Sequence, residues 1–390
     1  MKILFATESY YPNIDGGAIA QRRLVYELVK KGHEVGVVAP GFSFKNSIEQ
    51  DNGSTIFRTK GVTLPFYMNN TYHFSPLPIF QVKKIIKSFK PDVVDVCSPY
   101  PNGGSTLIYA KKYKIPIVGS IHMLPENMLS PFMNSRYYNI MKKYSWAYLV
   151  RFFNWVDWAT IPTQTGADMY VERGLKTPIT PISNGVNTEM FNPKNKGEYL
   201  RKQFKIPKEN VVLYTGRMSA EKNLDVLMHA IPSVLKEVNA HFLFCGSGGS
   251  YKEKMKQMTK TLEVSDHTTF VDFLDWKDYP NIYSLADLFI MPAEAELQSI
   301  VTMEAIASGL PAVVVDKGAV PELVSAGNGF LFESGNHKQL AANIVKILCD
   351  RKLKKTMSSK SLELIKNHSM EAVGSQFEKV YENLIDRYNQ

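Results

Sequence analysis

The segment Met291–Val324, MPAEAELQSIVTMEAIASGLPAVVVDKGAVPELV, decides the fold of this chain. It begins at the last residue of an apolar run, residues 288–291, which stops at Pro292. Residues 299–308 have the composition of a helix, and residues 311–315 predict the next buried strand. Strand, polar loop, helix and strand in this order are what a ligand-binding loop above a parallel sheet requires.

Two carboxylates, Glu296 and Glu304, lie eight positions apart across this strand–loop–helix junction. At a helical rise of about 1.5 Å per residue, the separation is at most about 12 Å. One acid could then meet a sugar and the other a ribose, with a diphosphate between them. The peptide N–H groups of Leu297, Gln298 and Ser299 lie at the helix start, where phosphate charge is favoured. The alternative is that both glutamates are ordinary surface acids on an amphipathic helix.

The segment resembles the signature of the retaining family 4 glycosyltransferases. The chain matches this signature in order: two glutamates, Glu296 and Glu304, are separated by seven residues and followed by Ala-x-x-x-Gly-x-Pro. A glycine turn and Pro-Glu-x-Val complete the match. Where the family usually has Glu-x-Phe-Gly, this chain has Gln298 and Ser299, and a Gln at the Phe position resembles the branch acting on glycerolipids. The resemblance implies an α/β fold of two Rossmann-like domains facing each other across a cleft, the GT-B arrangement, and a nucleoside diphosphate sugar as donor.

Length and composition indicate a globular protein with two domains. The chain has 390 residues, 44% hydrophobic and 21% charged, and no apolar run approaches the roughly 18 residues that span a bilayer. The N-terminus is interpreted as a first strand and not as a signal peptide. Three cysteines without metal spacing indicate a reducing compartment, here cytoplasmic, and are assigned to packing. The sequence has no Asp-x-Asp, so it requires no divalent metal.

Charge is distributed unevenly along the chain. Residues 1–185 contain 21 basic and 12 acidic residues, whereas residues 186–390 contain 25 of each, so the net charge of +9 lies in the N-terminal half. A basic half can face nucleic acid, an anionic membrane or a phosphorylated ligand. It can equally be a solvated surface without a partner.

The N-terminal half begins as a β-α-β unit with a glycine loop, Gly16-Gly17, at the head of its first helix. The loop lacks the Gly-x-Gly-x-x-Gly fingerprint, which argues against a nicotinamide cofactor. The resemblance implies that this loop lies against the donor phosphate and the acceptor; the alternative is a tight turn that needs residues without a Cβ. His122 ends the predicted strand 115–121, where ligands bind in open α/β sheets. The resemblance implies a contact of this histidine with the transferred sugar, although most lone histidines are structural.

Two further stretches of the N-terminal half are candidate acceptor or membrane surfaces. Residues 52–80 are predicted to be irregular and suit an acceptor-binding edge. Residues 132–158 interleave bases with ten aromatic residues, which suits a helix in a membrane interface. A core helix with aromatic packing is the alternative. Single-stranded nucleic acid also binds such patterns, but no nucleic-acid module accompanies this one, and we expect no nucleic acid.

We place the domain boundary near Asn184-Gly185, giving domains 1–185 and 186–369. Residues 370–390 form a closing helix that the resemblance predicts to pack back on the first domain. The second domain begins with the strand 211–215, and Arg217 and Lys222 follow it in a pattern resembling the family's donor motif. Arg binds phosphate oxygens as a fork and Lys as a point charge, so both can hold a diphosphate.

The sequence therefore predicts a retaining, metal-independent hexosyltransferase that needs no cofactor besides its donor, a nucleoside diphosphate sugar such as UDP-glucose. The predicted acceptor is a membrane lipid such as diacylglycerol or a lipid-linked glycan, on the inner face of the membrane. A soluble acceptor, a nucleotide-sugar epimerase or hydrolase, and a basic nucleic-acid-binding protein are the alternatives. The predicted catalytic residues are His122, Glu296, Arg217 and Lys222. The predicted donor-binding residues are Gly16, Gly17, Arg217, Lys222, Glu296, Leu297, Gln298, Ser299 and Glu304.

Overall fold

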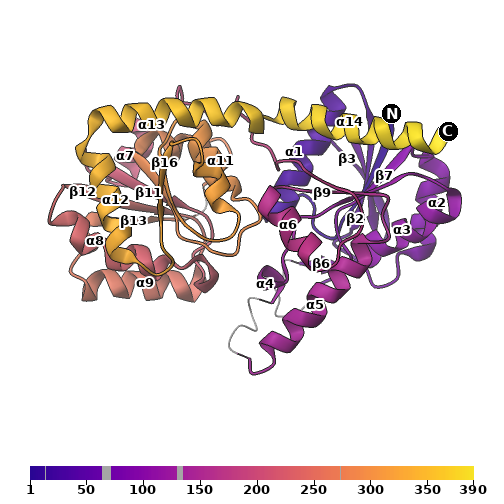
Figure 1. Ribbon diagram of the computed structural model, residues 1–390, viewed down its shortest axis with the longest axis horizontal. Helices are drawn as coiled ribbons and strands as arrows, with labels where there is room; N and C mark the ends of the chain where they lie inside the picture. Colours follow the sequence, from indigo (N-terminus) through magenta and orange to yellow (C-terminus); the bar gives the residue numbers. More distant parts are fainter. Residues whose placement is uncertain (14, 64–71, 130–134, 273) are drawn as a thin grey trace. The chain divides into compact units, whose positions relative to one another are not determined.

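The computed structural model describes residues 1–13, 15–63, 72–129, 135–272 and 274–390 and contains two compact units (Figure 1). Unit 1 consists of Met1–Gly185 and Met370–Gln390, and unit 2 consists of Val186–Ser369. Each is a Rossmann-like α/β unit built on a largely parallel sheet. Parts of two predicted surfaces, residues 64–71 and 132–134, lie outside the described residues.

Within the described residues, the sheet of unit 1 has eight strands, of which only β3 runs antiparallel to its neighbour. Their order is β10 (Ile179–Pro181), β9 (Trp158–Ile161), β8 (Ile117–Ser120), β7 (Val93–Val96), β1 (Lys2–Ala6), β2 (Glu34–Pro40), β4 (Ser54–Thr59), β3 (Ser47–Asp51). Central strands such as β7 are buried throughout, as expected of parallel strands covered on both faces. Strand β1 lies between β2 and β7 in the sheet. From β1 the chain first forms the strands on the β2 side and later crosses to β7 on the opposite side of β1. The carboxyl ends of β1 and β7 thus form a topological switch point, where open α/β sheets bind ligands.

The prediction that residues 52–80 are irregular is wrong for their first part. Residues 54–59 form β4, which pairs with β2 and closes an antiparallel hairpin with β3. Asn52 and Gly53 have φ of 48° and 84°, the left-handed values of a two-residue hairpin turn. The Asn-Gly dipeptide was the signal for this hairpin. Beyond it lie the short strands β5 (Val62–Thr63) and β6 (His73–Phe74).

The helices of unit 1 cover this sheet and include the last helix of the chain. They are α1 (Gly16–Lys30), α2 (Ile79–Phe89), α3 (Pro101–Tyr113), α4 (Pro125–Met128), α5 (Tyr138–Phe153), α6 (Gln164–Glu172) and α14 (Met370–Asn389). Phe377 and Leu384 of α14 belong to the core of unit 1. The hydroxyl of Tyr381 donates to the buried Asp95 at 2.6 Å, and Glu378 pairs with Lys31 and His33. With α14 included, unit 1 has 23 basic and 16 acidic residues, so its surplus is smaller than that of residues 1–185 alone.

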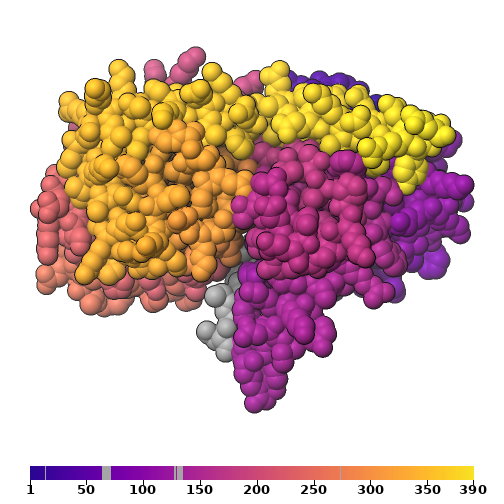
Figure 2. Space-filling view, viewed as in Figure 1, coloured from indigo at the N-terminus to yellow at the C-terminus, as the bar shows by residue number. Residues whose placement is uncertain are grey.

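Helix α5 has a buried side, as the core-helix alternative requires, and an exposed side that also carries aromatic residues. Trp146, Leu149 and Phe153 are buried in unit 1, whereas Tyr144 and Tyr148 are exposed. The N-terminal end of α5 stands out from the body of the unit (Figure 2). No helix among the described residues has both the length and the apolar character needed to cross a membrane.

The sheet of unit 2 has six parallel strands. Their order is β13 (Thr268–Val271), β12 (Ala240–Cys245), β11 (Asn210–Thr215), β14 (Leu288–Met291), β15 (Ala312–Val315), β16 (Gly329–Phe332). The helices are α7 (Glu198–Gln203), α8 (Leu224–Leu235), α9 (Gly249–Thr261), α10 (Tyr279–Ile282), α11 (Ile300–Ala307), α12 (His337–Cys349) and α13 (Arg351–Leu364). The switch point lies between β11 and β14. Cys97 and Cys245 pack in the interior as predicted, but Cys349 is exposed, which corrects its assignment to packing.

Candidate active site

The switch point of unit 2 brings together two of the predicted site residues. Lys222 ends a short 3-10 helix, Ala220–Lys222, in the loop after β11, and Glu296 lies in the loop after β14. Their charged groups approach to 2.5 Å, with side chains 17% and 16% exposed. The contact exists because β11 and β14 are neighbours in the sheet, so that the loops at their carboxyl ends meet. Arg217 follows the same strand; it is 57% exposed and lies 3.2 Å from Glu221.

Glu304 is buried, and the surface-acid alternative is therefore wrong for this residue. It lies on α11 with 2% of its surface exposed. The hydroxyls of Tyr279 and Tyr283 donate to its Oε2 at 3.0 and 2.9 Å. Burial, followed by the negative charge of Glu304, raises the pKa of both tyrosines well above the ordinary value. The two phenols therefore remain donors and hold the carboxylate in one position.

The two tyrosines were missed by sequence reasoning. Tyr283 also bonds to Thr215 at the end of β11, at 2.9 Å between the hydroxyl oxygens. This links the acid on α11 to the strand that carries the predicted cations. The available signal was a pair of tyrosines four positions apart just before β14, the spacing of neighbours on one helix face.

The loop before α11 explains why serine stands where the resembled family has glycine. Ser299 is the N-cap of α11, and its Oγ accepts from the N–H of Thr302 at 3.4 Å. Serine is among the preferred N-cap residues because its side chain satisfies an otherwise unpaired helix N–H. Leu297 and Gln298 precede the cap and are both buried. The predicted amide donors thus lie immediately before the first turn of α11.

Glu294, the other acid of this loop, stabilises the loop through its own contacts. Its carboxylate accepts from Asn223 at 3.2 Å and from Ser334, and pairs with Lys317 at 3.2 Å. Gly318 packs against the backbone of Glu294. Its φ is 65°, and an added Cβ would lie 2.6 Å from the Glu294 carbonyl oxygen. The glycine turn seen in the sequence is therefore required by close backbone approach.

The corresponding edge of unit 1 contains His122 and Gly17 side by side. A Cβ added to Gly17 would lie 3.9 Å from the Cβ of His122 and 3.3 Å from an oxygen of Asp15. Asp15 caps α1, accepting from the N–H of Ala18 at 3.0 Å. Gly16 is the first residue of α1 and is exposed. The two glycines therefore begin helix α1 beside the histidine, and the tight-turn alternative is wrong, since Gly17 has no positive φ and an added Cβ would meet nothing closer than 3.3 Å.

His122 is held in one orientation by Asn184. Its Nδ1 lies 3.1 Å from Oδ1 of Asn184. Since a carbonyl oxygen can only accept, Nδ1 carries the proton and Nε2 keeps its lone pair. Burial lowers the pKa of His122 to about 4, so the imidazole is neutral near pH 7. A neutral imidazole with Nε2 as acceptor can receive a hydrogen bond from a hydroxyl group.

Two buried acids near this edge were not foreseen. Glu8, just after β1, accepts from the backbone N–H of Asn102 at 2.6 Å and from its side-chain amide at 3.2 Å. Burial raises the pKa of Glu8 to about 8. Burial likewise raises the pKa of Asp95 to about 6, opposed by hydrogen bonds from Tyr381 and Ser120. An acid directly after a buried strand was the only sequence signal for Glu8.

Comparison with known proteins identifies the family. The description "Glycosyltransferase Family 4" matches residues 14–190, and "Glycosyl transferases group 1" matches residues 195–363. The chain is a family 4 glycosyltransferase with the GT-B fold. It is 23% identical to a GDP-mannose-dependent alpha-mannosyltransferase of Corynebacterium glutamicum, over 99% of this chain and 89% of that protein. It is 26% identical to the alpha-monoglucosyldiacylglycerol synthase of Streptococcus pneumoniae, over 83% of this chain and 73% of that protein.

Solved structures share the fold over nearly the whole chain. Sucrose-phosphate synthase from Thermosynechococcus elongatus has a TM-score of 0.83 at 19% identity, covering 99% of both chains. Anabaena HepE in complex with UDP-glucose has a TM-score of 0.75 at 19% identity, covering 98% of this chain and 100% of that one.

Proposed function

We propose that the protein is a retaining hexosyltransferase that uses a UDP-linked sugar, bound mainly by unit 2. The observation that carries the proposal is the group of charges at the switch point between β11 and β14. There Lys222 and Glu296 form a close pair, and Glu304 is fixed by Tyr279 and Tyr283. Cations next to acids at such an edge suit a ligand with a diphosphate between two polyhydroxylated rings.

Each charged group has a separate task in this proposal. Lys222 and Arg217 neutralise the diphosphate that leaves. The amides near Leu297–Ser299 and the start of α11 add fixed dipoles. Glu296 accepts hydrogen bonds from sugar hydroxyls, and Glu304 accepts them from the ribose.

The histidine and the glycine loop of unit 1 have tasks of their own in this proposal. The neutral His122 accepts a hydrogen bond from the transferred sugar through Nε2, while Gly16 and Gly17 allow close approach of the backbone to donor phosphate and acceptor. In the reaction, the bond from C1 of the sugar to the diphosphate oxygen breaks. A new bond to the acceptor oxygen forms on the same face, and the acceptor proton passes to the departing phosphate. No side chain is assigned as nucleophile or general base.

Because two side chains carry the positive charge, we propose that the reaction needs no divalent metal. Activity should persist after exhaustive chelation. A strict requirement for Mg²⁺ or Mn²⁺ would contradict this part of the proposal.

A UDP-linked glucose is the first donor to test. Anabaena HepE binds UDP-glucose in a structure with the same fold, which supports this choice. The relative from Corynebacterium glutamicum depends on GDP-mannose, so that donor belongs in the same panel.

For the acceptor we propose a hydroxyl group of a membrane lipid such as diacylglycerol, reached by peripheral binding at the inner face of the membrane. Unit 1, with 23 basic and 16 acidic residues, suits an anionic lipid surface. The relative from Streptococcus pneumoniae that makes monoglucosyldiacylglycerol supports a glycerolipid, as does Gln298.

The deciding experiment incubates purified protein with UDP-glucose, UDP-galactose, ADP-glucose and GDP-mannose. Each donor is offered diacylglycerol in anionic vesicles or a soluble glycan. The expected product is a glucosyl lipid whose anomeric proton coupling shows retention of configuration. Inversion would contradict the mechanism, and preference for the soluble glycan would contradict the acceptor. Free sugar or an epimer formed without acceptor would indicate a hydrolase or epimerase.

A further inference from the structure

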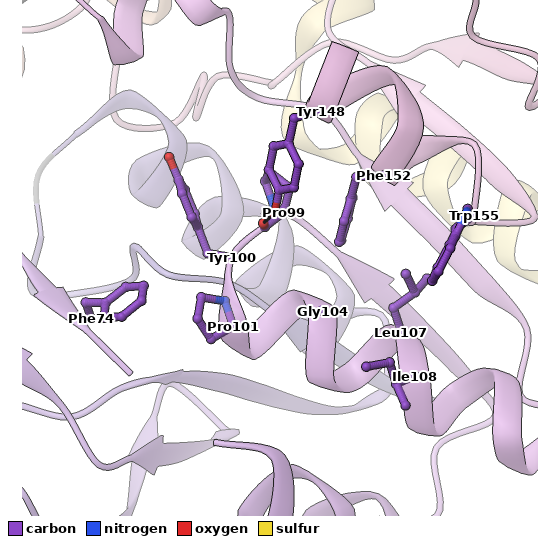
Figure 3. A pocket seen from close by; sticks show the side chains of 10 residues that line it. All are labelled: Phe74, Pro99, Tyr100, Pro101, Gly104, Leu107, Ile108, Tyr148, Phe152 and Trp155. Atoms are coloured by element: carbon purple, nitrogen blue, oxygen red, sulfur yellow. Dashed lines mark hydrogen bonds between the residues drawn. The ribbon is translucent and has the colours of Figure 1, made fainter. Parts of the chain in front are cut away.

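An apolar groove of about 440 Å³ crosses the surface of unit 1 between α3 and the end of α5 (Figure 3). Leu107 and Ile108 line it from α3, and Phe152 and Trp155 line it from the end of α5 and the following turn. Its volume lies within the range of about 300–1,000 Å³ typical of small-molecule sites. Its polar content is small, since one of the few hydroxyls, that of Tyr148, is engaged with the carbonyl of Pro99.

Apolar surface in this groove is left open to solvent. Ile108 is 49% exposed, and Tyr148 and Trp155 are each 50% exposed. Single exposed apolar side chains are ordinary, but several converging on one groove indicate a binding site. The groove is lined by apolar side chains from two helices, a lining that suits a hydrocarbon chain.

Three cationic residues are close in sequence to residues that line the groove. Lys111 and Lys112 follow Ile108 by three and four positions on α3, so they lie on the same side of that helix. Arg151 lies beside Phe152 near the end of α5. Within the described part of the chain, no carboxylate pairs with any of the three cations. Unpaired cations around an apolar groove match the interface of an anionic bilayer, where phosphate groups lie above acyl chains.

One end of the groove reaches the edge of the sheet where the candidate site lies. Tyr100, which lines it, follows β7. In the sheet, β7 lies between β1 and β8, and these two strands lead to the glycine loop at Gly16 and to His122. The hydroxyl of Tyr148 donates to the carbonyl oxygen of Pro99 and so holds α5 to the loop that follows β7. A ligand lying in the groove can therefore present its polar end at this edge.

We propose that this groove receives an acyl chain of the lipid acceptor, which leaves the glycerol hydroxyl near His122. The inference rests on the proposed function, because it assumes that the acceptor is an acyl glycerol. It predicts that acceptor efficiency depends on acyl-chain length through side chains of unit 1 and not through the donor-binding charges of unit 2.

The test compares Ile108→Glu with Val171→Glu. Val171, on α6 of the same unit, is 51% exposed and does not line the groove, so the two substitutions add the same charge at equal exposure. We expect Ile108→Glu to raise KM for dioctanoylglycerol at least about tenfold, because a carboxylate must be desolvated when the chain binds. KM for UDP-glucose, kcat with dibutyrylglycerol and the thermal unfolding temperature should not change. Equal KM values for the two variants would overturn the proposal.

A binding measurement separates failure of the groove from failure of the proposed function. Diacylglycerol with brominated acyl chains should quench the fluorescence of Trp155, and the quenching should largely disappear in Trp155→Phe. If no sugar is transferred to any lipid but this quenching occurs, the proposed function is wrong and the groove still binds acyl chains. If transfer occurs without quenching of Trp155, the groove is not the acyl site.

Discussion

The two units share one architecture but carry different chemistry at their switch points. In unit 2, the loops after β11 and β14 bring a lysine and a glutamate together as a close ion pair. In unit 1, the edge formed by β1, β7 and β8 carries a neutral histidine, a glycine loop and a buried glutamate whose pKa is raised to about 8. The charged edge suits a diphosphate, and the neutral edge suits hydroxyl groups and an apolar acceptor.

Burial explains much of this difference. The pKa values of His122, Glu8 and Asp95 are each shifted toward the neutral form, with burial as the largest cause. Lys222 and Glu296 are instead partly exposed and form a close ion pair. Two copies of one fold therefore offer different environments through the residues that end their strands.

The largest expected effect comes from removing one charge of unit 2. Lys222→Ala and Glu296→Ala should each lower kcat at least about 100-fold, because the first removes a preorganised charge from the leaving diphosphate and the second removes an acceptor for the sugar hydroxyls. Circular dichroism and thermal unfolding should remain those of the wild type. Lys254→Ala is the control, since Lys254 pairs with Asp225 at the surface of the same unit. Full activity in either site variant would remove the assignment of the donor site.

The buried contact between α14 and the sheet of unit 1 should have the next largest effect. Tyr381→Phe removes a donor from Asp95 and should lower the free energy of unfolding by about 1–3 kcal/mol. UDP binding by unit 2 should be unchanged. Tyr388→Phe removes a similar bond, to Asp157, from an exposed tyrosine, and should cost no more than about 0.5 kcal/mol. Equal losses in chemical denaturation would contradict the importance of the buried contact.

The neutrality of His122 can be tested by pH dependence. Its pKa is lowered from 6.5 to about 4, so the neutral form persists until the pH falls to about 4. We expect kcat/KM to show no acid limb near pH 6.5 from this residue. Asn184→Asp places a carboxylate beside Nδ1 and should raise the pKa, which would move an acid limb toward neutral pH. A wild-type limb at pH 6.5 that disappears in His122→Gln would contradict the neutral assignment.

For Glu8 we expect a change in the pH dependence of stability. Its pKa rises from 4.5 to about 8 on folding, so between these values the folded state binds the proton that the unfolded state has lost. The stability contributed by Glu8 is therefore complete below about pH 4.5 and falls as the pH rises to about 8, with a slope of at most about 1.4 kcal/mol per pH unit. Glu8→Gln should lose this slope in urea unfolding measured from pH 5 to 8. An unchanged slope would show that Glu8 is ionised in the folded protein.

Local pattern was sufficient for much of the sheet framework. Short apolar runs bounded by turn residues predict β1, β11 and β14 closely, and the sequence also contained the Asn-Gly turn of the β3–β4 hairpin, which was overlooked. The prediction failed over residues 54–59, which form β4. Residues 52–80 were judged as one region, and the prolines and aromatic residues in its later part made the whole region look irregular. A strand of six residues is missed when its sequence is judged together with a much longer irregular segment.

Sequence alone determined which residues end which strands, and hence that Lys222, Glu296 and His122 lie in the segments that follow strands, at the edges of the sheets. Tertiary structure decided their environments. It buried Glu304 beneath Tyr279 and Tyr283, joined His122 to a residue 62 positions away, and brought Tyr381 to Asp95 across 286 positions. Strand and helix periodicities report only near neighbours along the chain, whereas burial and long-range hydrogen bonds depend on which elements pack together.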